Sequence, residues 1–218
     1  LGDVYKRQRW KYSIVEEKRP GEYMPVFENE RGTYIFNSKD LCMVEHMEDI
    51  LTSGIDSLKI EGRMKSIAYV ATVVNAYRMA LDRYSAAPDE PLPAELSKEL
   101  DYASHRPYTA GFAFGDPGAA GQAPQSADYV SEAQISAVVL SYDAQAQTAY
   151  VEQRNRFADG DVLSILSPGD IARTFTVRSI RNEAGETQQT APHPKQRLHI
   201  GCIEPVQAGD ILRKISGC

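Results

Sequence analysis

The sequence contains no long hydrophobic run and few cysteines. No apolar stretch approaches the roughly 20 residues that a membrane-spanning helix needs, and the first residues, LGDVYKRQRW, lack the apolar core of a secretory signal. The three cysteines, Cys42, Cys202 and Cys218, are too widely spaced for a CxxC metal site and too few for a disulfide framework. These absences predict a cytoplasmic protein that does not associate with membranes.

The common catalytic motifs are missing as well. HExxH, GxSxG, GxGxxG and Walker sequences do not occur, so the usual hydrolase and nucleotide-binding mechanisms lack support. The net charge is −6, and all of it falls in residues 86–218, where 11 Lys and Arg face 17 Asp and Glu. This balance argues against nonspecific binding to DNA or RNA. It does not exclude a local basic patch formed by the basic residues between Lys6 and Arg19.

Length and composition divide the chain into segments of different character. With 218 residues, 42% of them apolar, it can form one large or two small domains. Residues 1–8 fit poorly with the rest of the chain and are interpreted as a sequencing or assembly artefact. Residues 9–86 predict alternating strands and helices, 87–131 a linker rich in Pro, Ala and Gly, and 132–218 an all-β domain.

The most informative stretch is 55–65, IDSLKIEGRMK. Its apolar residues Ile55, Leu58 and Ile60 predict a buried strand. The residues after it predict a helix that Ser66 caps, with an apolar face of Ile67, Val70, Ala71, Val74 and Leu81. The stretch therefore predicts a strand, a charged loop and a helix.

Ligands bind at the loop that follows the strand of such a unit, where the next helix offers free N–H groups. Glu61, Arg63 and Lys65 lie in this loop and are the candidate catalytic residues. The alternative is that Glu61 pairs with Arg63 or Lys65 and only closes the loop.

The preceding residues predict a second unit of the same kind. Segments 23–27 and 33–36 are short strand candidates around the polar ENERG loop, and a hairpin is plausible there. A helix is then predicted with Ser38 or Asp40 as its N-cap and Gly54 at its end. Together these elements predict consecutive βαβα units of a parallel sheet or barrel.

Within the linker, the segment SHRPYTAGF is aromatic and polar. Its residues His105, Arg106 and Tyr108 could bind a phosphate or a ring, or they could dock the loop onto the preceding domain, which is the favoured interpretation.

The last part of the chain predicts short strands joined by turns. The strand candidates are 135–142, 148–153, 162–166, 172–180, 196–203 and 211–215. Two similar segments, FADGDVL at 157–163 and VQAGDIL at 206–212, each place a Gly-Asp turn before a strand. This repeat predicts a small closed β-barrel.

Several long stretches resemble one family. RWKYSIVEEKRPGEYMPVFENERGTYIFNSKDLC, GIDSLKIEGRMKSIAYVATVVNAYR and SHRPYTAGF, with VEQRNRF and APHPKQ, are similar to the collagenase-like peptidase family, peptidase family U32. The resemblance implies an α/β plus all-β fold: the last βα units of a TIM-type barrel, followed by a small C-terminal β-barrel resembling those of translation factors. It also implies hydroxylation of wobble uridine in tRNA to 5-hydroxyuridine, with prephenate as co-substrate and tRNA as partner.

The resemblance also implies a cofactor. Several members hold a four-iron–four-sulfur cluster on four cysteines, and Cys42 in the SKDLC motif corresponds to the last of these ligands. The family usually reads Cys-Arg-Trp where this chain has Gln8 before Arg9, so the remaining ligands would lie upstream. One thiolate cannot hold such a cluster, and this chain alone is expected to lack it and to be inactive.

Substrate contacts are implied by the same resemblance. A uridine in an anticodon loop must be stacked and its phosphates met by cations, and Arg9, Trp10 and Lys11 offer such groups. Arg63 suits either a phosphate or a carboxylate of prephenate. Two other functions stay open: a collagenase-like peptidase, and a non-enzymatic RNA- or protein-binding module formed by residues 132–216.

Overall fold

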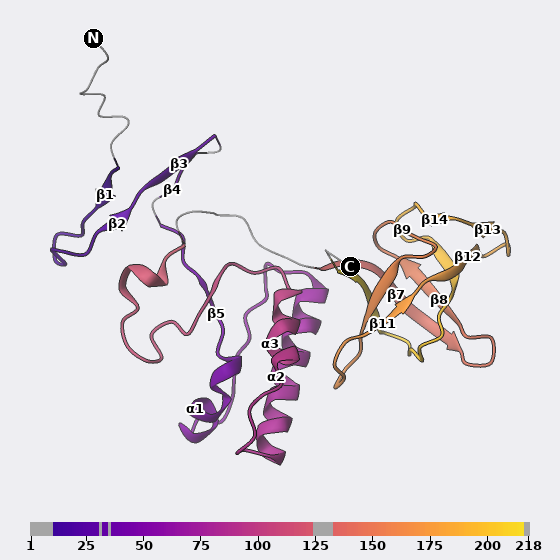
Figure 1. Cartoon of the computed structure of the whole chain (residues 1–218), viewed down its shortest axis with the longest axis horizontal. Coiled ribbons are helices and arrows are strands. Elements are labelled where there is room, and N and C mark those ends of the chain that lie inside the picture. Colours follow the sequence, from indigo (N-terminus) through magenta and orange to yellow (C-terminus); the bar gives the residue numbers. More distant parts are fainter. Residues whose placement is uncertain (1–10, 31, 35, 124–132, 216–218) are drawn as a thin grey trace, which may run out of the picture. The chain divides into compact units, whose positions relative to one another are not determined.

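The computed structural model describes residues 11–30, 32–34, 36–123 and 133–215 (Figure 1). They form two compact units. The first comprises the described residues within Leu1–Met43 and His105–Val130, and the second those within Val44–Ser104 and Ser131–Cys218. The chain therefore passes between the units three times. The boundaries predicted at residues 8, 86 and 131 stay predictions.

The first unit is built from short strand pairs. β1 (Ser13–Ile14) pairs antiparallel with β2 (Met24–Pro25), and β3 (Phe27–Asn29) with β4 (Gly32–Tyr34). The latter pair is the hairpin expected around ENERG, with shorter strands. β5 (Asp40–Leu41) runs parallel to β6 (Tyr108–Thr109), and a 3₁₀ turn, η3, covers Gly118–Gly121.

The helix predicted from Ser38 or Asp40 begins later than expected. A 3₁₀ turn, η2 (Val44–His46), leads into α1 (Met47–Thr52), and His46 occupies the N-cap. The prediction is wrong because Asp40 belongs to β5, where its backbone N–H donates to the carbonyl of Pro107 at 3.0 Å. The predicted end is confirmed: Gly54, with φ of +81°, follows the helix.

Residues 55–60 form no strand in the described structure, so the predicted buried strand is wrong here. Ile55 is half exposed, and Leu58 and Ile60 are only partly buried. A strand exists only where a neighbour completes its hydrogen-bond ladder, and none of the described residues does so for this segment. The described residues therefore show a mixed α/β arrangement without a parallel barrel sheet.

The helix predicted after Ser66 is confirmed as α2 (Ile67–Ala86). The Ser66 hydroxyl accepts a hydrogen bond from the backbone N–H of Tyr69 at 3.2 Å. The predicted apolar face is wrong, because Ile67 is 85% exposed and the buried residues are Thr72, Val73, Asn75, Ala76 and Ala80. The buried face is set by its neighbours: α3 (Ala94–Asp101) lies beside α2 (Figure 1).

The largest sheet of the second unit is antiparallel and has eight strands in the order β11-β10-β16-β7-β8-β15-β12-β13. The strands are β7 (Ala133–Asp143), β8 (Thr148–Gln153), β10 (Val162–Leu166), β11 (Arg173–Thr176), β12 (Arg178–Asn182), β13 (Thr187–Gln188), β15 (Arg197–Gly201) and β16 (Ile211–Ile215). A separate pair joins β9 (Phe157–Ala158) to β14 (Thr190–Ala191).

The sheet curls around one hydrophobic core. Phe175 on β11 and Ile180 on β12, near opposite ends of the strand order, belong to the same buried cluster. The all-β prediction is therefore confirmed, whereas the sheet is open between β11 and β13 in the described residues rather than a closed barrel. The strand predicted over 172–180 is two strands, because the regular pairing with β10 ends at Val177. Its N–H still donates to the carbonyl of Asp161 at 2.8 Å, but its own carbonyl accepts from Gly160, one residue out of register, at 2.9 Å.

The repeated Gly-Asp segments have the same local structure. Gly160 and Gly209 adopt φ of +85° and +97°, a region that favours glycine. In both segments the aspartate side chain, Asp161 or Asp210, accepts a 2.9 Å hydrogen bond from the backbone N–H three residues earlier. The sequence repeat therefore predicts a structural repeat correctly.

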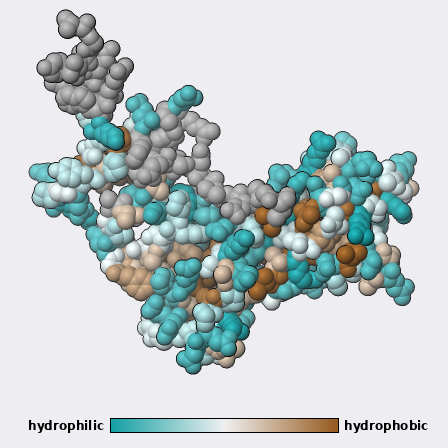
Figure 2. Space-filling view, viewed as in Figure 1, coloured by the Kyte–Doolittle hydropathy of each residue, from teal (hydrophilic) through white to brown (hydrophobic). Residues whose placement is uncertain are grey.

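The surface is mostly polar on the face shown in Figure 2, where hydrophobic residues lie in small groups among hydrophilic ones. None of the helices in the described part of the chain is both long and apolar enough to cross a membrane.

Candidate functional site

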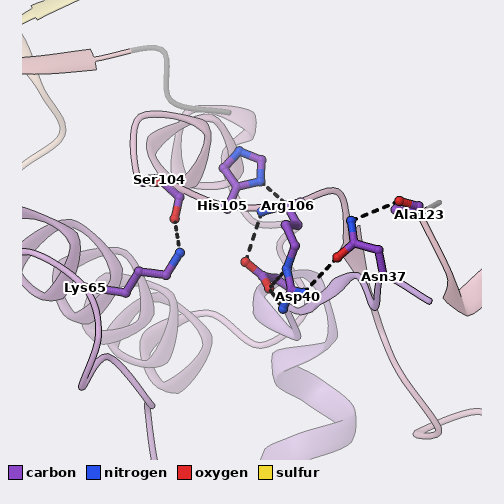
Figure 3. Close-up of polar contacts among 7 residues, drawn as sticks. All are labelled: Asn37, Asp40, Lys65, Ser104, His105, Arg106 and Ala123. Atoms are coloured by element: carbon purple, nitrogen blue, oxygen red, sulfur yellow. Dashed lines mark hydrogen bonds and ion pairs between the residues drawn. The ribbon is translucent and has the colours of Figure 1, made fainter. Parts of the chain in front are cut away.

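A polar cluster in the first unit joins the SKD segment to the SHRPYT segment (Figure 3). Arg106 places Nε and Nη2 at 2.9 and 2.8 Å from Oδ1 of Asp40, and its backbone N–H donates to Oδ2 at 3.0 Å. Nη1 donates to Asn37 at 3.2 Å, and the Asn37 amide donates to the carbonyl of Ala123 at 3.0 Å. The ion pair is largely shielded, with the two side chains 25% and 18% exposed.

The neighbouring aromatic side chains reinforce this cluster. The rings of His105 and Tyr108 stack with centroids 4.1 Å apart and planes 7° apart, and Nδ1 of His105 lies 2.7 Å from the carbonyl oxygen of Arg106. His105 is buried. These are the contacts of a docked loop, the interpretation that the sequence favoured. Binding of a phosphate or a ring by these residues stays a prediction.

Cys42 lies directly after β5. Its backbone N–H donates to the carbonyl of Thr109 at 2.9 Å, which continues the parallel pairing by one residue. Because side chains alternate along a strand, Cys42 and Asp40 share one face and Leu41 the other. Within the described residues no group of three or more His, Cys, Asp and Glu could hold a metal ion. Cys42 can therefore offer one thiolate, and the described residues do not complete a cluster site.

A cavity of about 610 Å³ lies on the Leu41 side of this strand pair. Its walls include Leu41, Thr109 and the exposed Phe112, and its charged lining residues are Arg19, Glu22, Lys39 and Asp116. Arg19 is engaged by surrounding carboxylates, whereas the partly buried Lys39 forms no ion pair with any residue that the structure describes. The lining thus balances two basic against two acidic side chains and favours no charged ligand. Sequence reasoning missed it because its walls come from segments some 70 to 90 residues apart.

The charged loop belongs to the second unit. Glu61 accepts a hydrogen bond from the backbone N–H of Arg63 at 2.8 Å and lies 3.8 Å from the ammonium of Lys59. Lys65 donates to the carbonyl of Ser104 at 2.7 Å (Figure 3) and approaches the Tyr69 ring. Glu61 therefore closes the loop through a backbone N–H and Lys59, not through the side chains of Arg63 or Lys65.

Arg63 differs from its neighbours. Its side chain is exposed and forms no hydrogen bond or ion pair with any residue in the described ranges. Gly62 beside it packs closely on α2, since a Cβ there would lie 3.1 Å from a methyl group of Val70. The loop backbone is thus held against the helix while the guanidinium extends into solvent, which leaves it available for a carboxylate or a phosphate.

The remaining candidates are placed only in part. Arg9 and Trp10 lie outside the described residues, and Lys11 is exposed. Of the predicted site residues, the structure brings together His105, Arg106 and Tyr108 in one unit and Glu61, Arg63 and Lys65 in the other.

Comparison with known proteins gives consistent matches. Residues 2–123 match the sequence model described as peptidase family U32, and residues 131–213 match that of the family's C-terminal domain. The chain is 38% identical over 182 residues to tRNA hydroxylation protein P of Escherichia coli strain K12, covering 83% of this chain and 39% of that protein. It is 32% identical over 207 residues to tRNA hydroxylation protein P1 of Bacillus subtilis strain 168, covering 94% of this chain and 49% of that protein.

The chain thus spans less than half the length of these two relatives. Among solved structures, the C-terminal domain of a U32 peptidase from Geobacillus thermoleovorans is 30% identical, with 37% of this chain and 99% of that domain aligned and a TM-score of 0.36.

Proposed function

The chain belongs to peptidase family U32, and on that premise we propose that a protein carrying it hydroxylates a uridine in tRNA. The observation that carries the proposal is the match to two tRNA hydroxylation proteins over 83% and 94% of this chain. We further propose that the product is 5-hydroxyuridine at the wobble position, that prephenate is the co-substrate, and that these 218 residues alone are inactive. A tRNA substrate would place the protein in the cytoplasm.

The chemistry of the charged loop supports this proposal. Both substrates are anionic, one through its phosphates and the other through two carboxylates, and a guanidinium binds either group with two parallel hydrogen bonds. The side chain of Arg63 is exposed and has no hydrogen-bond or ion-pair partner among the described residues. Its loop precedes the N-terminus of α2, where helix N–H groups favour negative charge. We assign Arg63 to substrate binding and Lys65 to holding the loop through Ser104.

Cys42 is the proposed cluster ligand. A thiolate is the normal protein ligand of a four-iron–four-sulfur cluster, and Cys42 is partly exposed beside a hydrogen-bonded strand pair. The other ligands, together with the earlier strands of a TIM-type barrel, are proposed to come from outside the described residues. Asp40, paired with Arg106 on the same face, would fix the backbone that carries Cys42.

The proposal can be tested with a chimera. The matched segment of the E. coli relative is replaced by the corresponding residues of this chain and expressed in a strain that lacks its own tRNA hydroxylation proteins. Mass spectrometry of tRNA nucleosides should then detect hydroxylated uridine. A chimera that accumulates as folded protein and yields none would overturn the proposal.

Variants of the chimera separate the assigned roles. Arg63→Ala should reduce the hydroxylated nucleoside, with Arg83→Ala on the exposed end of α2 as a matched control. Cys42→Ala should lower the iron bound per chain after anaerobic purification, whereas Cys202→Ala, which alters a buried core thiol, should leave it unchanged. Unchanged iron in Cys42→Ala would remove this residue from the ligand set.

A further inference from the structure

The outward face of the β sheet carries a polar cavity of about 660 Å³ across β7, β8, β12 and β15. Directly opposed residues form a row on it: Arg181 on β12 pairs with His199 on β15, which pairs with Tyr150 on β8. The rings of Tyr150 and His199 stack, with centroids 4.7 Å apart and planes 27° apart. An aromatic pair and an arginine thus lie side by side over the cavity.

These side chains do not serve the hydrophobic core. Their neighbours along the two strands are completely buried: Ala149, Val151, Leu198 and Ile200. Because a strand points successive side chains to opposite faces, Tyr150 and His199 lie on the solvent side. His199 is exposed and Tyr150 partly exposed, so the ring pair is accessible to a ligand.

The charges around the cavity leave cations available. Glu183 accepts a hydrogen bond from the Tyr150 hydroxyl at 2.7 Å, and Asp143 accepts two from the backbone N–H groups of residues 145 and 146 at 2.9 and 3.0 Å. The side chain of Arg181 is exposed and forms no hydrogen bond or ion pair with any described residue. Arg197, also exposed, lies two residues before His199 and thus on the same face, where its guanidinium interacts with the Tyr150 hydroxyl.

The acidity of the second half of the chain does not belong to this sheet. Residues 86–130 hold two Lys and Arg against seven Asp and Glu, a net charge of −5, whereas residues 131–218 hold nine against ten, a net charge of −1. The domain that carries the cavity is therefore almost neutral, and the charge argument against an anionic ligand does not apply to it.

Gly201 is one of the residues that line the cavity. A Cβ at this position would lie 2.3 Å from the carbonyl oxygen of Arg178, so no side chain fits where β12 and β15 approach. The glycine therefore lets the two backbones approach each other closely beside His199.

We propose that this surface, the Tyr150 face (Tyr150, His199, Arg181 and Arg197), binds nucleotides of single-stranded RNA. Proteins that hold single strands stack bases on aromatic rings and meet the phosphates with arginine and lysine. Here one base stacks on the Tyr150–His199 pair, and the two arginines contact the adjoining phosphates. The inference rests on the proposed tRNA substrate and names the surface on which an unpaired part of that tRNA is held.

The test measures RNA binding by the full 218-residue chain. The probe is a short fluorescein-labelled single-stranded RNA of mixed sequence, followed by fluorescence anisotropy over a range of salt concentrations. Tyr150→Leu should raise the Kd about tenfold, which is within the range for loss of one stacked base. Arg181→Ala should raise the Kd and reduce the slope of log affinity against log salt by about 0.7, as for one phosphate contact on a single strand.

Two further variants make the test specific. Arg156→Ala removes the same charge from an exposed position outside the cavity and should leave the Kd within a factor of about two. Tyr150→Phe keeps the ring and should bind like the unaltered chain, which separates stacking from a general loss of structure. An unaltered chain that does not bind the RNA, or equal losses in Arg181→Ala and Arg156→Ala, would overturn the inference.

The result of the RNA-binding test can be distinguished from the result of the chimera test. An inactive chimera together with Tyr150-dependent RNA binding upholds the Tyr150 face and removes the proposed hydroxylation. An active chimera whose tRNA affinity is unchanged by Tyr150→Leu overturns the Tyr150 face alone.

Discussion

Within the second unit, a buried ion pair joins α2 and α3 to the β sheet. Nη2 of Arg213 on β16 lies 3.1 and 3.2 Å from the carboxylate oxygens of Glu99 on α3 and 3.2 Å from the hydroxyl of Ser164 on β10. Nη1 lies 3.4 Å from the hydroxyl of Thr72 on α2. The arginine and glutamate side chains are only 2% and 4% exposed, so four elements meet at one pair of charges.

We therefore expect Glu99→Leu to destabilise the protein by about 3–5 kcal/mol, because it leaves a buried guanidinium without its carboxylate. Nε of Arg213 already lacks a hydrogen-bond partner within the described residues, and the groups that would remain beside the guanidinium, two hydroxyls and the Tyr102 ring, carry no negative charge. The double variant Glu99→Leu with Arg213→Met should recover most of this loss, since replacing a whole buried pair by apolar side chains is often close to neutral.

Urea unfolding followed by far-UV circular dichroism gives the free energy of unfolding of each variant. The helices and the sheet are expected to unfold in one transition. The loss in free energy of unfolding of the double variant should be smaller than the sum of the two single losses by about 0.5–3 kcal/mol. The reasoning is refuted if Glu99→Leu costs less than about 1 kcal/mol, the size of an exposed pair, or if the two losses add.

Three further predictions concern local features of the second unit. Ser66→Ala should lower the free energy of unfolding by about 1 kcal/mol through loss of the N-cap of α2, and Ser66→Asp should retain it; equal stability of all three proteins would contradict the cap. Gly201→Ala should cost about 1–3 kcal/mol by overpacking against the Arg178 carbonyl, and an unchanged Tm would show that β12 moves aside freely. Burial acts to raise the pKa of Asp161, but hydrogen bonds from Lys214 and from the backbone N–H of Ala158 outweigh it and hold that pKa below its usual 3.8. The stabilisation from Asp161 is therefore present above pH 3.8 and is lost as the pH falls through the lower pKa of the folded state. In this pH range the free energy of unfolding should change less with pH in Asp161→Asn than in the unaltered chain.

Local signals predicted much of the second unit. Ser66 followed by a long stretch without Gly or Pro predicted α2, and three strands, 148–153, 162–166 and 211–215, have the predicted bounds. These features depend on residues that are close in sequence: a helix N-cap, a hydrophobic periodicity and a turn motif. The buried face of α2 was wrong because it depends on α3 and on Arg213, which binds Thr72 from 141 residues away.

The candidate sites likewise depend on contacts between residues far apart in sequence, which the sequence did not predict. The residues of the charged loop could be named from sequence, yet the partner of Lys65 is a carbonyl 39 residues away, and the pairing of Asp40 with Arg106 spans 66 residues. The Tyr150 face was missed although two of its three strands, β8 and β15, were predicted. Only the register of β8 against β15 brings Tyr150 next to His199, and this register cannot be predicted from the sequence of either strand alone.

The most direct test of the proposed function is the hydroxylated uridine content of tRNA from a strain whose own tRNA hydroxylation proteins are replaced by the chimera carrying this chain. We predict that mass spectrometry detects the hydroxylated nucleoside, and that Arg63→Ala reduces it while Arg83→Ala does not. A chimera that is folded and iron-loaded but leaves tRNA uridine unmodified would contradict the proposed function.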